Sequence, residues 1–145
     1  MNVSVIGSGR WGSFQAWYAD KIGHEVRLYG PADRPQMVEL QANRDNGMLT
    51  MPESVELITD LDKALQNDVI IISVPSQVLR GLMREITAHG AQGKLFVLCM
   101  KGLEIGTGKR LTEIVEEESP ANRVAVWIGP GHVQEFVRGV PNCMV

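Results

Sequence analysis

The order in which apolar runs follow one another constrains this 145-residue chain most strongly. Short runs rich in β-branched residues alternate with longer segments whose apolar residues recur at helical spacing. The clearest strand candidate, 68–74, is continuously apolar from Val69 to Ile72, as expected of a strand buried on both faces of a sheet. The connections are long enough for helical crossovers. The pattern therefore predicts an α/β fold, a doubly wound and mainly parallel sheet with helices on both faces.

The individual elements follow from the same periodicities. We predict strands at 3–6, 25–29, 55–58, 68–74, 95–100 and 124–128, with a further strand beginning at 142. We predict helices at 10–22, 35–46, 107–118 and 133–138, a short helix capped by Asp60 and another helix capped by Ser76. The sequence shows no repeat and no Pro- or Ser-rich linker, so 1–145 is predicted to be one domain. The chain stops inside an apolar run, and we expect a C-terminal partner domain to be missing from it.

The charge balance disfavours several classes of partner. With 14 Lys and Arg against 17 Asp and Glu, the net charge is −3 and the isoelectric point is near 5.6. General nucleic-acid binders and proteins that bind anionic membranes are normally basic, so neither is expected. No run of about 20 apolar residues predicts a transmembrane helix, and the N-terminus does not resemble a signal peptide. The cysteines, Cys99 and Cys143, are far apart and are expected to pack as small apolar side chains, which favours a cytoplasmic protein without a metal site.

A glycine-rich segment, 7–12, directly follows the first predicted strand and opens the first predicted helix. Its sequence, GSGRWG, fits the pattern GxGxxG in the context that dinucleotide-binding sites require. Gly7 would allow the tight turn, Gly9 would let a pyrophosphate approach the backbone, and Gly12 would let the helix pack closely on the strand. The N–H groups and dipole of the helix N-terminus would attract the phosphates. We therefore predict a Rossmann-type fold that binds NAD or NADP; the alternative is a glycine-rich turn without a ligand.

The end of the second predicted strand bears on the choice between the two cofactors. NAD-preferring folds usually place Asp or Glu there to bond the ribose 2′-hydroxyl. Here the strand ends at Tyr29 and is followed by Gly-Pro-Ala at 30–32, without a carboxylate. Arg34 could bind a 2′-phosphate, so the choice between NAD and NADP stays open. The alternative makes Asp33 a helix N-cap and Arg34 a solvated surface charge.

Three further loops follow predicted strands, whose carboxyl ends face the ligand crevice in such folds. After the fourth strand, Pro75 would stiffen the loop beside the cofactor or would simply start the next helix. After the fifth, Lys101 could hold an anionic substrate group or polarise a carbonyl; the alternative is an ordinary exposed lysine. After the sixth, His132 of the segment GPGH could donate a proton, although a helix-capping or surface role is more common for such a histidine.

Together, these pieces resemble the N-terminal domain of the bacterial-type NAD(P)-dependent glycerol-3-phosphate dehydrogenases. That family has G-x-G-x-(W/Y)-G at its start, V-P-(S/T) after the central strand, then K-G-(L/I)-E, and later S-G-P-(S/T)-x-A-x-E. This chain has the corresponding segments at 7–12, 74–76, 101–104 and 129–135, so the resemblance spans almost its whole length.

The resemblance implies reversible hydride transfer between NAD(P)H and dihydroxyacetone phosphate, giving sn-glycerol 3-phosphate for phospholipid synthesis. It implies a cytoplasmic enzyme, homodimeric at full length, that binds a small-molecule substrate but no nucleic acid and no membrane. The proton-donating lysine of the family lies in a C-terminal helical domain. No catalytic residue is therefore expected in this chain, which should bind dinucleotide but catalyse little or nothing.

The resemblance also implies a set of ligand contacts. The expected substrate contacts are Lys101, Gly129 and Gly131. The expected cofactor contacts are Gly7, Ser8, Gly9, Arg10, Trp11, Gly12, Tyr29, Arg34, Val74, Pro75, Lys101 and Val133. The chain departs from the family pattern at Pro31 and Ala32, where Arg or His is frequent, and at Gly131 and Val133, where a hydroxyl side chain and alanine are usual. These departures are compatible with a relative of altered substrate use.

Two other functions fit the same residues. One is the Rossmann domain of another two-domain dehydrogenase that acts on a hydroxy acid or keto acid. The other is a non-catalytic module that senses nucleotides, since a fold alone does not determine function. A panel of carbonyl substrates and the sequence of the partner domain would separate these alternatives.

Overall fold

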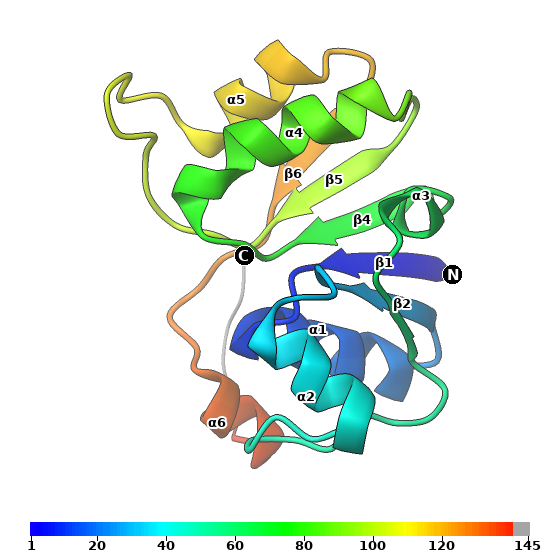
Figure 1. Ribbon diagram of the computed structural model, residues 1–145. Helices are drawn as coiled ribbons and strands as arrows, with labels where there is room; N and C mark the ends of the chain where they lie inside the picture. Colours follow the sequence, from blue (N-terminus) through cyan, green and yellow to red (C-terminus); the bar gives the residue numbers. More distant parts are fainter. Residues whose placement is uncertain (141–145) are drawn as a thin grey trace.

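The strands form a single parallel sheet that runs through the middle of the molecule (Figure 1). The computed structural model describes residues 1–140. Within them, the six strands lie in the order β3-β2-β1-β4-β5-β6, and every neighbouring pair is parallel. The strands are β1 Asn2–Ile6, β2 Glu25–Tyr29, β3 Glu56–Ile58, β4 Val69–Ile72, β5 Leu95–Leu98 and β6 Arg123–Val126. This is the Rossmann strand order, so the predicted fold class is confirmed.

The pairing register aligns the carboxyl ends of the strands at one edge of the sheet. Ile6 of β1 lies opposite both Tyr29 of β2 and Ile72 of β4. Leu98 of β5 lies opposite both Ile72 and Val126 of β6. The loops that follow these strands therefore begin at one edge. The strand order reverses between β1 and β4, which is where folds of this kind bind ligands.

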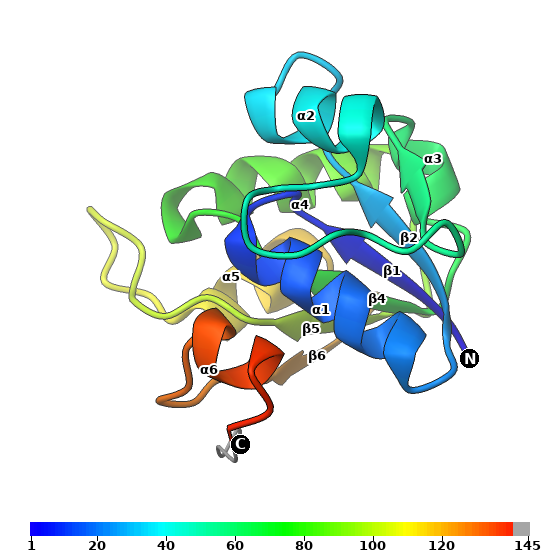
Figure 2. The same cartoon turned by 90° about the horizontal axis from the view of Figure 1, so that it is seen from below.

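The helices cover both faces of the sheet (Figures 1 and 2). The helices of one face are α1 Arg10–Lys21, α2 Pro35–Asn43 and α6 Val133–Val137. The helices of the other face are α3 Leu61–Ala64, α4 Leu79–Ala88 and α5 Leu111–Glu118. A short 3-10 helix, η1 Ser76–Val78, leads directly into α4. No helix within residues 1–140 combines the length and the apolar character needed to cross a bilayer.

The alternation of β4 side chains explains why its sequence is continuously apolar. Ile70 and Ile72 are buried in the core beside α4 and α5, where Phe96 of β5 joins them. Ile71 is buried in the core beside α1, where it meets the cluster that includes Phe14. A strand enclosed in this way has no polar face, so helix cover on both sides follows from the sequence.

One predicted helix begins later than the sequence indicates. The range 107–118 was predicted as helix from its apolar spacing, but α5 begins only at Leu111. Residues 99–110, the β5–α5 loop, precede it. Gly106 and Gly108 lie there at φ of 90° and 68°, a left-handed conformation that cannot continue a right-handed helix.

The helix predicted at 35–46 ends at Asn43 because the next residue turns the chain. Arg44 has φ of 56° and stands at the C-cap of α2. Its guanidinium donates to the carbonyl of Met51 at 3.1 Å and to that of Val55 at 2.6 Å. These bonds stabilise the left-handed residue, and local sequence spacing does not reveal them.

The two predicted side-chain N-caps have different outcomes. The Asp60 carboxylate accepts a hydrogen bond from the Asp62 N–H at 3.0 Å, so that cap is confirmed. The Ser76 cap is wrong, because Ser76 is the first residue of η1 and its hydroxyl accepts from the Gln77 side chain at 3.1 Å. The predicted strand from 142 and Cys143 lie outside the described residues.

Candidate functional site

The three glycines of the 7–12 turn have different surroundings. Gly7 has φ of +119°, and a Cβ there would lie 2.1 Å from the carbonyl oxygen of Ser73, in the turn after β4. A Cβ on Gly12 would lie 1.7 Å from the carbonyl oxygen of Gly7. A Cβ on Gly9 would meet no atom within 4 Å. Packing therefore requires the outer two glycines, as predicted, whereas the middle glycine borders open space.

The N-terminus of α1 has the features of an anion site. Gly9 is its N-cap residue and offers no side-chain cap, and the first turn contains no acidic residue. The first N–H groups of a helix have no intrahelical partner, and the helix dipole is positive at this end. Arg10 begins the helix and is exposed, although a cation there opposes the dipole. A bound anion would remove that conflict.

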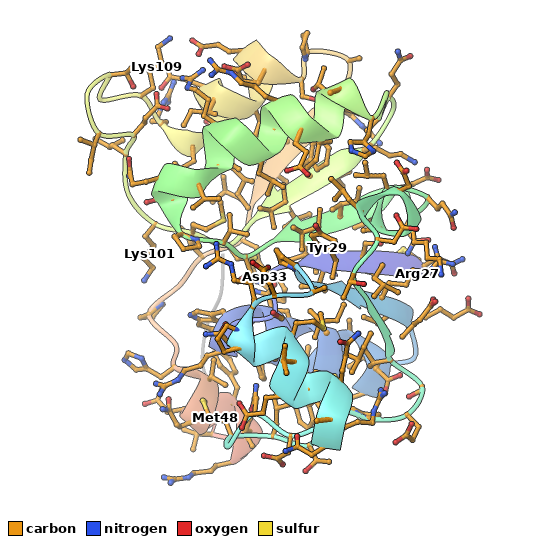
Figure 3. The ribbon with its side chains drawn as sticks, viewed as in Figure 1. Arg27, Tyr29, Asp33, Met48, Lys101 and Lys109 are labelled. Carbon is orange, nitrogen blue, oxygen red and sulfur yellow. The ribbon has the colours of Figure 1, made fainter. Side chains whose placement is uncertain are left out.

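The residue that follows β2, Gly30, has little room for a side chain. A Cβ on Gly30 would lie 2.5 Å from the Ser8 hydroxyl oxygen and 3.1 Å from the Met37 side chain. The Ser8 side chain is therefore turned toward the interior, and Ser8 is buried. Tyr29 is half-buried against the core beside α4 (Figure 3), and burial is the main cause that raises the pKa of its phenol.

The segment after β2 holds an exposed arginine. Arg34 is the N-cap residue of α2 and has no side-chain capping bond, so the alternative in which Asp33 caps this helix is wrong. Asp33 is also exposed (Figure 3). The structure thus leaves a cation and an anion side by side, and the choice between NAD and NADP stays open.

A crevice of about 390 Å³ lies at the carboxyl ends of the central strands. Its lining comes from the start of α1 and from the loops after β4, β5 and β6: Trp11, Gln15, Ser73, Val74, Pro75, Ser76, Cys99, Met100, Lys101, Ile128, Gly129, Pro130, Gly131 and His132. The structure thus brings together four segments that the sequence analysis singled out separately. The remaining predicted contacts lie outside this lining, on the 7–12 turn, at the end of β2 and at Val133.

Lys101 joins two of these loops. Its ammonium group donates a hydrogen bond to the carbonyl oxygen of Gly129 at 2.8 Å, and the residue is exposed. Figure 3 shows it between the β5–α5 loop and the segment that follows β6. An ammonium group has three donors, so Lys101 can keep this bond and still contact a ligand.

Gln15 and Cys99 are among the polar crevice residues that were not predicted as site residues. The Gln15 amide contacts the Cys99 sulfur through Nε2 at 3.1 Å and through Oε1 at 3.2 Å. Gln15 follows Trp11 by one helical turn, so helical spacing could have placed it beside the crevice. Cys99 was predicted to pack as a small apolar side chain, but it is only partly buried and it lines the crevice.

Burial raises the pKa of the Cys99 thiol to about 11, against an opposing hydrogen bond from Gln15. The ordinary value is 9.0, so at pH 8 the thiolate fraction falls roughly a hundredfold. We expect iodoacetamide to alkylate Cys99 slowly in the folded chain and about a hundredfold faster in urea. Peptide mapping measures the alkylated fraction of Cys99 separately from that of Cys143. Equal alkylation rates in the folded chain and in urea at pH 8 would contradict the burial argument. In the folded chain, the alkylation rate of Cys99 should keep rising up to pH 11.

An aromatic cluster attaches α6 to α1 beside the crevice. Phe136 lies 5.4 Å from Phe14 and 6.1 Å from Trp11, measured between ring centroids. Val133, the first residue of α6, is buried in the core beside α1. His132 is the N-cap residue of α6, as one interpretation predicted, and its N–H donates to the Glu135 carboxylate at 3.1 Å.

The described residues contain no cluster of three or more His, Cys, Asp or Glu side chains that could hold a metal ion. The residues that line the crevice instead carry an amide, a thiol, one ammonium group, an imidazole, an indole N–H and two hydroxyls, from Gln15, Cys99, Lys101, His132, Trp11, Ser73 and Ser76. Such groups bind and orient an organic anion.

The strand order, the glycine turn and the crevice at the strand ends define a domain of the Rossmann, dinucleotide-binding class. Residues 2–145 match the family described as the N-terminus of NAD-dependent glycerol-3-phosphate dehydrogenase, and the chain belongs to this family. The resemblance inferred from the four sequence motifs is thereby confirmed.

Individual relatives agree with this assignment. A Chlorobium luteolum protein named glycerol-3-phosphate dehydrogenase (NAD(P)+) is 38% identical, over 100% of this chain and 46% of its own length. The crystal structure of glycerol-3-phosphate dehydrogenase from Coxiella burnetii has a TM-score of 0.88 at 25% identity, over 99% of this chain and 45% of that chain. The Saccharomyces cerevisiae enzyme of the same name, at 20% identity, shares the fold with a TM-score of 0.81, over 95% of this chain and 44% of that one. This chain thus spans less than half the length of these relatives.

Proposed function

We propose that this chain is the NAD(P)-binding domain of a glycerol-3-phosphate dehydrogenase, which interconverts dihydroxyacetone phosphate and sn-glycerol 3-phosphate. The observation on which this proposal rests is the open turn at Gly9, where α1 begins without a side-chain cap and a Cβ would meet no atom within 4 Å; the N-terminus of a helix is suited to bind a phosphate group. Family membership and the names of the relatives support the same reaction.

The residues of the chain have distinct roles in this proposal. The N–H groups around Gly9, together with Arg10 and Trp11, would hold the pyrophosphate. Val74 and Pro75 would confine the cofactor, and Tyr29 and Arg34 would border its adenosine half. When bound, the nicotinamide supplies or accepts the hydride. Gly129 and Gly131 would lie along the substrate, in the loop that Lys101 contacts through the Gly129 carbonyl. Val133, the first residue of α6, would lie near the cofactor.

The titratable side chains that line the described crevice are Cys99, Lys101 and His132. Lys101 suits an anionic ligand, and the raised pKa of Cys99 keeps that thiol protonated at neutral pH. We propose that a C-terminal helical domain supplies the proton-donating lysine and much of the substrate phosphate site. We also propose that the full-length protein is a cytoplasmic homodimer whose product feeds phospholipid synthesis.

The binding half of this proposal is tested by calorimetric titration of the 145-residue chain with NADH and NADPH. We expect one dinucleotide per chain, and their affinity ratio measures the cofactor preference. Assay of the full-length enzyme with dihydroxyacetone phosphate tests the reaction. No turnover of that substrate would exclude this dehydrogenase and favour the other two-domain dehydrogenases or a sensing module.

Lys101→Ala in the full-length enzyme should raise the KM for dihydroxyacetone phosphate by about a hundredfold, because it removes a charge-assisted bond to an anion. The KM for NADH should rise by about tenfold or less, because the cofactor keeps its contacts with the glycine turn. Steady-state kinetics with each ligand varied in turn measures the two effects. Equal losses for both ligands would contradict this placement of Lys101.

A further inference from the structure

The β5–α5 loop (residues 99–110) presents Lys101, and its outer part folds back on itself: Leu103 and Arg110 form an antiparallel bridge, and the Glu104 N–H donates to the Lys109 carbonyl at 2.9 Å. Gly102, Gly106 and Gly108 all have positive φ, so three of its residues lie in conformations that glycine favours. Two of its apolar side chains are exposed, Leu103 at 53% and Ile105 at 81%. Burial of these two side chains therefore does not hold the outer part of the loop against the rest of the domain, and polar contacts do so instead.

One polar contact comes from η1, the short helix that follows Pro75. The Gln77 side chain donates from Nε2 to the carbonyl oxygen of Leu103 at 2.9 Å. Its Oε1 accepts from the N–H of Ile105 at 2.9 Å. A single amide thus binds the backbone on both sides of Glu104 and fixes this part of the loop against η1.

A second contact is the carboxylate of Glu104. It accepts from Arg80 of α4 in a bidentate pair, Nε at 2.6 Å and Nη2 at 2.8 Å. It also accepts from the Thr107 hydroxyl at 2.6 Å. The Glu104 side chain is only 13% exposed. Bidentate pairs of arginine and carboxylate fix orientation as well as distance, so Glu104 is held more firmly than its place in a loop suggests.

The arginine partner is itself fixed by α5. Arg80 contacts Glu118 and Glu117, and Lys109 at the end of the loop pairs with Glu117. Figure 3 shows Lys109 at the side of the molecule where α4 and α5 lie. The Arg80 hydrogen bonds are the main cause that lowers the pKa of Glu104 to about 2, so the pair persists at every pH at which the chain would be assayed.

We propose that Glu104 and Gln77 are positioning residues that hold Lys101 at the crevice. Glu104 follows Lys101 by three residues, and Gly102 between them has φ of +113°. The bend at Gly102 directs the chain from residues 103–105, which Gln77 and Arg80 hold, back to the crevice. Lys101 then donates to Gly129. Helix α4 thereby determines where the ammonium group lies. This inference rests on the proposed function, and it gives a role to the glutamate of the KGLE segment that the ligand contacts leave unexplained.

The test is a double-mutant cycle on NADH affinity, measured by calorimetry on the 145-residue chain. Lys101→Ala should weaken NADH about tenfold, as expected for one charge-assisted hydrogen bond. Glu104→Gln should weaken it about threefold, because Lys101 remains but is less well placed. The variant with both changes should bind as weakly as Lys101→Ala alone, since Glu104 acts through Lys101.

Two further variants make the cycle decisive. Glu56→Gln is the matched control, because Glu56 also bonds an arginine, Arg27, at 2.9 Å but lies on β3, away from the β5–α5 loop; the NADH affinity of this variant should equal that of the wild type. Gln77→Met keeps the volume of the side chain and removes both of its hydrogen bonds to the loop backbone, so it should lower NADH affinity as much as Glu104→Gln does. If Glu104→Gln fails to fold, Gln77→Met takes its place in the cycle.

The outcomes separate the two proposals. Losses that multiply in the double variant would overturn the positioning role, and so would unchanged affinity in folded Glu104→Gln and Gln77→Met. If the wild-type chain binds NADH and Lys101→Ala binds it equally well, the positioning role is overturned, while the cofactor-domain proposal stands. A wild-type chain that binds no NADH would overturn both.

Discussion

Gly9→Val should abolish dinucleotide binding while the chain stays folded. The Cβ that this change adds points into space with no atom within 4 Å, so nothing in the structure resists it. That space is where we propose that a pyrophosphate meets the backbone, and a branched side chain would occupy it. We expect calorimetry to show at least a hundredfold weaker NADH binding, or ~3 kcal/mol.

The fold should tolerate this variant for reasons that the backbone supplies. Gly9 has φ of −71° and ψ of −178°, an extended conformation that valine also adopts. It stands at the N-cap of α1, where loss of a favourable cap costs about 1 kcal/mol. The melting temperature should therefore fall by only a few degrees, roughly 2–4 °C for a domain of this size.

Gly9→Ala is the graded control for the binding result. It adds one methyl group in the same direction and should weaken NADH less than valine does. ADP-ribose contains the pyrophosphate but no nicotinamide, so it should lose affinity in parallel with NADH. Unchanged NADH affinity in folded Gly9→Val would show that the dinucleotide does not lie on this turn.

The architecture was predictable because its causes are local. A strand buried on both faces must be apolar throughout, as β4 is, and a helix against a sheet must repeat its apolar residues about every 3.6 positions, as α4 does. Crossover connections of one hand place helices on opposite faces where the strand order reverses, between β1 and β4. The crevice was predictable too, because parallel strands end at the same edge.

What sequence reasoning missed depends on contacts between distant residues. Gln15 and Cys99 are 84 residues apart, and neither alone indicates the other. Arg80 of α4 and Glu104 of the β5–α5 loop pair across 24 residues. The Ser8 side chain turns inward because Gly30 leaves room for it. Such pairings form only in the folded chain, and the periodicity of one segment does not predict which distant residues will meet.

Gly12→Ala should unfold or severely destabilise the chain, although helix propensity favours the opposite. Within a helix, alanine is more stable than glycine by about 1 kcal/mol. At Gly12, however, the added Cβ would lie 1.7 Å from the carbonyl oxygen of Gly7 and 2.9 Å from its carbonyl carbon. Both atoms belong to the backbone, so no side-chain rotation relieves the overlap. The helix α1 must move away from β1.

The cost of that movement exceeds the gain in propensity. Overpacking a well-filled site costs about 1–3 kcal/mol, and more where the backbone must shift. Here α1 packs on β1 and β2 through buried side chains that include Phe14, and the displaced turn also contacts the turn after β4 at Ser73. We therefore expect a loss of at least about 3 kcal/mol against a total stability of roughly 5–15 kcal/mol.

Gly81→Ala provides the matched control, because the two substitutions are chemically identical and both lie inside helices. Gly81 is exposed in α4, and a Cβ there would meet no atom within 4 Å. Only propensity acts at that residue, so urea unfolding should show a gain of about 0.5–1 kcal/mol. Opposite signs at the two glycines would establish that Gly12 is required by the contact between helix and turn. If Gly12→Ala were as stable as Gly81→Ala, α1 could not lie as close to the Gly7 carbonyl as the structure places it, and the glycine turn would lose the rigidity on which the open space beside Gly9 depends.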